Sequence, residues 1–179
     1  LAIAPEFAYA ETLVAQAEGI EASVITFSDT AVSIPEGETN VTAKGTDVTI
    51  SADGTYVFTG SCSNGSISVK KELQDVTIII RDLTLAKDGD KAIKFKSGSC
   101  GTIVVEGTCN ISSSNDKGII KANALSDDND NLIYDANGNT TGGDLTISGT
   151  GTLNLSSSYQ ETVDGELEGA DAINCEGDL

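Results

Sequence analysis

A unit that occurs twice, 26 residues apart, is the feature that most limits the possible folds of this chain. The first copy is residues 75–94, DVTIIIRDLTLAKDGDKAIK, and the second is residues 101–120, GTIVVEGTCNISSSNDKGII. Each copy holds short β-branched runs separated by polar corners, the pattern of strands joined by turns. A repeat of this length is typical of units that stack to share one core. We therefore predict that each copy is one coil of a β-solenoid.

The repeat also predicts which residues stack on one another. A shift of 26 places Leu83 on Cys109 and Asp90 on Asp116. A later stretch, residues 143–157, continues the pattern after a polar insertion. There a shift of 42 aligns the apolar positions as follows: Leu145 with Ile103, Ile147 with Val105, and Leu153 with Ile111.

The composition supports β structure in one domain. The 179 residues include no Met, Trp or His, but 19 Gly, and 39% of them are hydrophobic. Aliphatic and β-branched side chains therefore have to fill the core, which favours strands over a helical bundle. No apolar run is long enough to span a membrane as a helix.

The two ends of the chain differ from its middle. Residues 1–22 are alanine-rich with apolar spacing of a helix, and predict either a cap on the first coil or an arm that packs on another subunit. Ala8-Tyr9-Ala10 has the form of a signal-peptidase site, which favours an extracellular or cell-surface protein. Residues 177–179 repeat residues 143–145, which lead into a strand. We therefore predict that the solenoid, residues 23–179, is open at its C-terminal coil.

The net charge of −18 excludes some partners. Nucleic-acid binding needs a basic face and is not expected. Calcium capture and simple solubility both remain open as the reason for the charge. The same charge predicts repulsion of an acidic polysaccharide, unless calcium bridges carboxylates of the protein and the glycan.

Two groups of oxygen-bearing side chains are candidate calcium ligands, because calcium takes six to eight hard oxygen ligands. The first lies in the insertion and comprises Asp127, Asp128, Asp130, Asp135, Asn137 and Asn139. The second is Asp90 and Asp116, with Asp88 and Asn115 beside them. The alternative for the first group is a solvated loop. For the second it is neutralisation by Lys91 and Lys117, which occupy matching repeat positions.

Catalysis is not expected. The chain has no histidine and no GxSxG motif, which disfavours a catalytic triad. A lyase-like elimination would depend on the single arginine, Arg81, whose neighbours suggest an exposed strand or corner position. The four cysteines form no CxxC pair, and are either disulfides or small buried hydrophobes. Because Cys109 aligns with Leu83, burial is favoured at that position.

Several stretches resemble the bacterial extracellular carbohydrate-binding β-helix family, which has a fold like that of polysaccharide lyases. They are VTISADGTYVFTG (48–60), residues 75–94, GDLTISGTGTLNL (143–155) and DAINCEGDL (171–179). The resemblance implies a right-handed parallel β-helix, export, and calcium bound by acidic corner residues. It also implies binding of cellulose or acidic sugars. The chain departs from the pattern in the insertion at 126–139.

Two functions follow as predictions. The first is a non-catalytic extracellular module that binds acidic polysaccharide with calcium. The second is a structural subunit of a filament, adhesin or matrix, assembled head to tail through the N-terminal arm and the open last coil.

Overall fold

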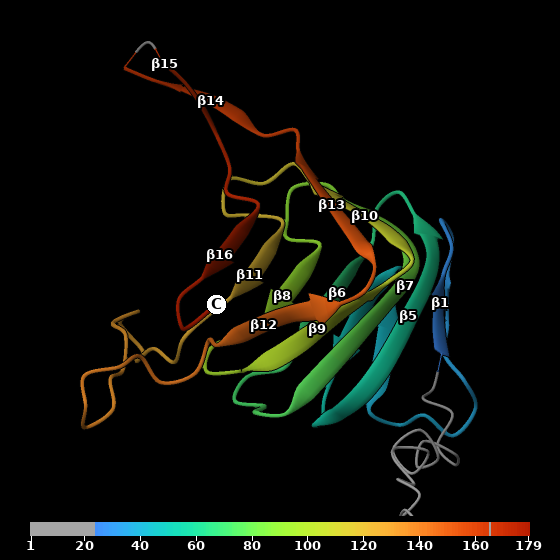
Figure 1. Ribbon diagram of the computed structural model, residues 1–179, viewed down its shortest axis with the longest axis horizontal. Helices are drawn as coiled ribbons and strands as arrows, with labels where there is room; N and C mark the ends of the chain where they lie inside the picture. Colours follow the sequence, from blue (N-terminus) through green and yellow to red (C-terminus); the bar gives the residue numbers. More distant parts are fainter. Residues whose placement is uncertain (1–23, 165) are drawn as a thin grey trace, which may run out of the picture.

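The computed structural model describes residues 24–164 and 166–179, in which strands are joined by turns and loops and there is no helix (Figure 1). The predicted cap helix or arm, residues 1–22, and the Ala8-Tyr9-Ala10 motif lie outside the described residues. Within the described part, no helix could cross a membrane.

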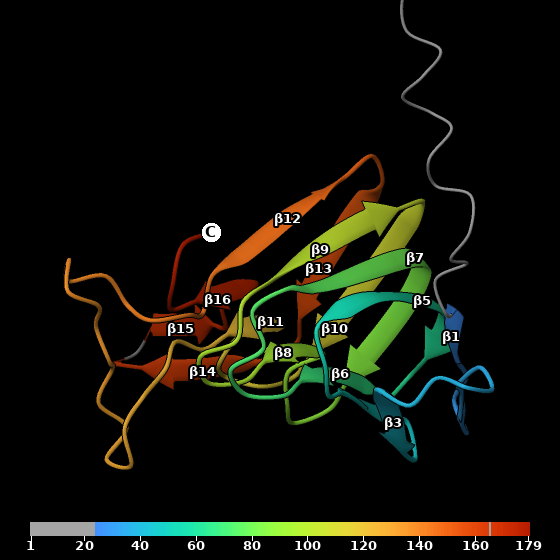
Figure 2. The same cartoon turned by 90° about the horizontal axis from the view of Figure 1, so that it is seen from below.

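Two main sheets face each other across one hydrophobic core (Figures 1 and 2). The first sheet has eight strands: β1 (Val24–Phe27), β2 (Val32–Ser33), β5 (Gly54–Cys62), β7 (Val76–Lys87), β9 (Gly101–Glu106), β10 (Thr108–Ser113), β12 (Leu145–Gly149) and β13 (Thr152–Ser157). The second has six: β3 (Val41–Lys44), β4 (Asp47–Ile50), β6 (Ser66–Val69), β8 (Ile93–Phe95), β11 (Ile120–Ala122) and β16 (Ile173–Cys175). A separate hairpin, β14 (Gln160–Val163) and β15 (Glu166–Gly169), projects from the body (Figure 1).

The prediction of a right-handed parallel β-helix is wrong. Each main sheet is mixed: β1 pairs antiparallel with β2, and β3 antiparallel with β4, beside the parallel pairs of the later strands. The physical reason is the short connections near the N-terminus. Only Gly45 and Thr46 separate β3 from β4, and a link this short can join only antiparallel strands. The resulting arrangement resembles a β-sandwich.

The predicted spacing of 26 residues between the two copies of the repeated unit is confirmed for one pair of strands and wrong by one residue for two others. Between β7 and β10 the spacing is the predicted 26 residues, with Thr84 opposite Asn110. It is 25 between β7 and β9, where Val76 pairs with Gly101, and 27 between β8 and β11. The corners therefore differ in length from one copy to the next.

The alignment of the later strands was wrong by two residues. Ile147 pairs with Ile103 and Leu153 with Cys109, a spacing of 44 and not 42. An error of two keeps the same side chains facing inward, because strand side chains alternate with a period of two. Leu145 is accordingly buried, as its apolar character predicts.

The core consists of aliphatic side chains from both sheets, with Phe27 and Phe58 packed at a ring separation of 6.1 Å. All four cysteines are free thiols; Cys62 and Cys109 are buried and Cys100 and Cys175 are partly exposed. This confirms the predicted burial of Cys109. Burial also raises the pKa of the Cys109 thiol above its usual value.

Candidate functional site

The outer face of the six-stranded sheet carries a row of lysines. Along β8, Ile93 and Phe95 are fully buried, while Lys94 between them is partly exposed on the opposite face. The neighbouring strand β11 repeats this pattern around Lys121, which lies directly opposite Lys94 in the parallel register. Adjacent strands are about 4.8 Å apart, so the two side chains emerge side by side.

Two adjoining grooves on this face form one trough. Their volumes are about 460 Å³ and 210 Å³, and Lys94 and Asn123 line both. Six lysines line the combined trough: Lys71, Lys91, Lys94, Lys96, Lys117 and Lys121. Because the whole chain has only nine lysines and a net charge of −18, this gathering of positive charge stands against the overall charge of the molecule. We call this surface the lysine trough.

The lysine trough holds more positive charge than its own carboxylates neutralise. Lys121 pairs with Glu176 at 3.0 Å between Nζ and Oε1, and Lys91 lies 3.4 Å from Asp90. Within residues 24–164 and 166–179, the other four lysines of the trough have no ion-pair partner. Like charges in register on neighbouring strands repel one another, so the trough favours an anionic ligand.

The pKa of Lys94 is lowered by its partly buried position among the other lysines of the trough. Partial burial lowers it below the usual value for lysine, and repulsion from Lys91, Lys96 and Lys121 lowers it further. The Asp90 carboxylate acts in the opposite direction but does not cancel these effects. An anion placed over Lys94 would relieve both the repulsion and the loss of solvation.

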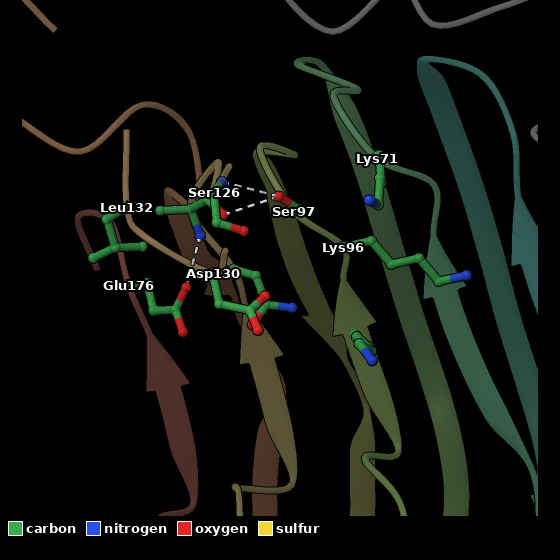
Figure 3. Close-up of a pocket in the computed structure, with 10 residues that line it drawn as sticks. Lys71, Lys96, Ser97, Ser126, Asp130, Leu132 and Glu176 are labelled. Carbon is green, nitrogen blue, oxygen red and sulfur yellow. Dashed lines mark hydrogen bonds between the residues drawn. The ribbon is translucent and has the colours of Figure 1, made fainter. Parts of the chain in front are cut away.

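One wall of the trough comes from the insertion, residues 125–141. Backbone hydrogen bonds connect three residues of the insertion that are eight positions apart, Leu125, Ile133 and Thr141. The Leu125 N–H donates to Thr141 O at 2.7 Å, the Ile133 N–H to Leu125 O at 2.8 Å, and the Thr141 N–H to Ile133 O at 2.9 Å. These bonds divide the insertion into two loops, which we call the first lobe (125–133) and the second lobe (133–141). Side chains of the first lobe then line the trough: Ser126, Asp130 and Leu132 (Figure 3). The Ser126 N–H also donates to Ser97 Oγ, which ties the lobe to the end of β8.

The two lobes are built alike, a repeat that our reading of the sequence missed. In the first, Asp127 Oδ1 accepts hydrogen bonds from the N–H groups of Asn129 and Asn131, both at 2.9 Å. In the second, Asp135 Oδ1 accepts from Asn137 and Asn139 at 2.8 and 2.9 Å. The pattern D-x-N-x-N, spaced by eight residues, was visible in the chain.

These bonds stabilise the ionised carboxylates within the turns. The pKa of Asp127 is lowered, mainly by hydrogen bonds from the Asn131 side chain and backbone, and that of Asp135 mainly by the Asn139 N–H. Each lobe thus supplies an internal partner for its own aspartate.

All but one of the candidate calcium ligands are exposed at the surface: Asp127, Asp128, Asp130, Asp135, Asn137, Asn139, Asp88, Asp90 and Asp116. The exception is Asn115, which is buried and donates hydrogen bonds to Ser113 Oγ and to the Gly118 carbonyl oxygen. Among the described residues, no three acidic or cysteine side chains converge in a group that could hold a metal ion. The Lys91 ammonium lies 3.4 Å from Asp90 Oδ1, and the Lys91 N–H donates to the same oxygen. The predicted neutralisation by lysine is therefore found for Asp90, whereas the described part of the chain has no ion pair between Asp116 and Lys117. Calcium binding stays a prediction.

The lysines are the candidate site residues that we missed in the sequence, where only Lys91 and Lys117 were considered, and only as partners of the aspartates. Their signal was the alternation Ile93-Lys94-Phe95-Lys96, which places lysines on the outer face of a strand. Net charge alone led to the expectation that the protein repels acidic glycans. The lysines of the trough show that the local charge of this surface differs from the net charge of the chain.

The lysine trough lies on the outer face of a sheet and is lined by lysines and by the hydroxyl groups of Ser97 and Ser126. Such an open polar surface is suited to binding an extended ligand. Comparison with protein families agrees: a family model described as carbohydrate-binding domain-containing protein matches residues 44–173. The chain belongs to this family, and the match supports a carbohydrate-binding role. No curated protein and no solved structure gives a significant match.

Proposed function

We propose that the chain is a non-catalytic extracellular module whose lysine trough binds acidic polysaccharide, with uronate carboxylates facing the lysines. The observation that carries this proposal is the gathering of six of nine lysines in one trough of an acidic protein. Ammonium–carboxylate hydrogen bonds are shorter and stronger than neutral ones. A polymer with many carboxylates can make several of them at once.

The dimensions of the trough suit an extended chain. Lys91 lines the trough before β8 and Ser97 lines it after β8, so the trough extends past both ends of this strand. The three residues of β8 alone span about 10 Å. Sugar hydroxyls have partners as well, since Ser97, Ser126 and Asn123 line the same trough. The proposed ligand is therefore a run of several sugars and not a single residue.

A chelator distinguishes two ways in which the protein could bind an acidic polysaccharide: direct contact with the lysines, or bridging of carboxylates by calcium. We expect polygalacturonate binding, measured by affinity gel electrophoresis, to persist in excess EDTA because the lysines need no metal ion. We also expect binding to be lost at about 1 M NaCl, where the screening length is about 3 Å. Binding that disappears in EDTA and returns with calcium would favour bridging through the aspartates of the insertion.

Raising the pH supplies a second check. The pKa of Lys94 lies below the usual value, so this lysine loses its charge before an ordinary lysine does. We expect polygalacturonate affinity to fall as the pH rises toward that pKa. Affinity that stays constant across the alkaline range would argue against a role for Lys94.

A further inference from the structure

One carboxylate of the protein already occupies the lysine trough. Glu176 follows β16, and its Oε1 lies 3.0 Å from Lys121 Nζ. Its Oε2 accepts a hydrogen bond from the Ala124 N–H at 3.1 Å (Figure 3). One ammonium and one backbone amide therefore hold the two oxygens of a single carboxylate.

The position of Glu176 is stabilised by its own backbone. Its N–H donates to Ala122 O at 3.0 Å, and its carbonyl accepts a hydrogen bond from Thr140 Oγ1 at 3.2 Å. The backbone is thus bonded to β11 on one side and to the insertion on the other. The side chain can leave Lys121 by rotation without disturbing either contact, and it is 32% exposed to solvent.

We propose that Glu176 is an internal competitor that occupies the position of a ligand carboxylate and sets a threshold for binding. This inference rests on the proposed function of the trough. For a uronate to reach Lys121 and the Ala124 N–H, the Glu176 side chain has to swing out. Because it is tethered, its effective concentration at the site is on the order of millimolar or more.

A tethered competitor discriminates between monomer and polymer. A free uronic acid offers one carboxylate and cannot outcompete Glu176 at low concentration. A polyuronate engages other lysines of the trough first, so its next carboxylate also reaches the site at high effective concentration. The trough therefore selects polymeric acidic glycan over free acidic sugar.

Glu176→Gln is the direct test, because an amide oxygen can still accept from Ala124 N–H while the charge on Lys121 is released. By calorimetry we expect a galacturonate trimer to bind this variant about tenfold more tightly than the wild type, as for one charged hydrogen bond gained. Polygalacturonate should bind with a smaller gain. Asp130→Asn is the matched control: Asp130 also lines the trough, and its loss removes the same charge.

The outcomes separate the two proposals. If wild type binds polygalacturonate but Glu176→Gln is no tighter for the trimer than Asp130→Asn, the competitor role is wrong. If neither variant nor wild type binds polygalacturonate, the proposed function itself fails. A measurement on the wild type keeps the test independent of the variant's folding. The amide resonance of Ala124 should shift on saturation with polygalacturonate, and an unchanged resonance would contradict displacement of Glu176.

Discussion

Replacing Lys94 and Lys121 together by glutamine should lower the affinity for polygalacturonate about 100-fold. The two residues lie opposite each other in the register of β8 and β11; Lys94 lines both grooves of the trough and Lys121 lines the smaller one. Each hydrogen bond to a charged group contributes about 1.5–3 kcal/mol. Lys94 has no ion-pair partner among the described residues and contributes in full, whereas at Lys121 part of the gain is offset by displacement of Glu176, so the two together contribute about 3 kcal/mol. Calorimetric titration of the variant against the wild type measures this loss.

A charge-matched control separates local recognition from the general field of the protein. Lys44 and Arg81 do not line the trough, and replacing both by glutamine changes the net charge by the same amount. This control should bind with nearly wild-type affinity. Equal losses in the two double variants would show that total charge, and not the trough, governs binding.

Gly60→Ala should destabilise the protein by about 2–5 kcal/mol, a large effect for a single methyl group. Gly60 has φ +96°, a conformation that costs other residues about 1–2 kcal/mol. A Cβ here would also lie 2.3 Å from the Phe27 carbonyl oxygen on the neighbouring strand. Because that atom belongs to the backbone, the strands have to separate, and overpacking of this kind costs about 1–3 kcal/mol.

Gly37→Ala isolates the conformational part of that cost. Gly37 has φ +89°, but no atom lies within 4 Å of a Cβ built there. Urea unfolding of both variants should show a loss of only about 1–2 kcal/mol for Gly37→Ala. Equal losses would mean that the crowding against Phe27 is relieved without cost.

The fold was predictable where residues that are near in sequence decide it. The β-branched runs predicted strands, and the repeat predicted the parallel pairing of β7 with β10. Register at the flanks was not predictable, because each corner adds or removes a residue. Within β7, between the part that pairs with β9 and the part that pairs with β10, Asp82 has φ +46° and accepts a hydrogen bond from the Thr108 N–H. The spacing changes from 25 to 26 residues across this point.

The candidate site depended on contacts between distant segments. Lys94 and Lys121 are far apart along the chain, and the correct spacing of 27 was needed to place one opposite the other. The predicted pair Asp90 and Asp116 used the spacing of 26 instead. Glu176 was still less accessible to prediction, since it reaches the trough only because β16 pairs with β11.

The sequence by itself determined the all-β character, the repeated unit and the alternation of inward and outward side chains. These depend on local propensity and on a period of two residues. The tertiary structure alone decided that the early antiparallel pairs and the later parallel pairs share the same two sheets. It also gathered the lysines of an acidic chain into one trough, because strand register, and not composition, sets which charges become neighbours.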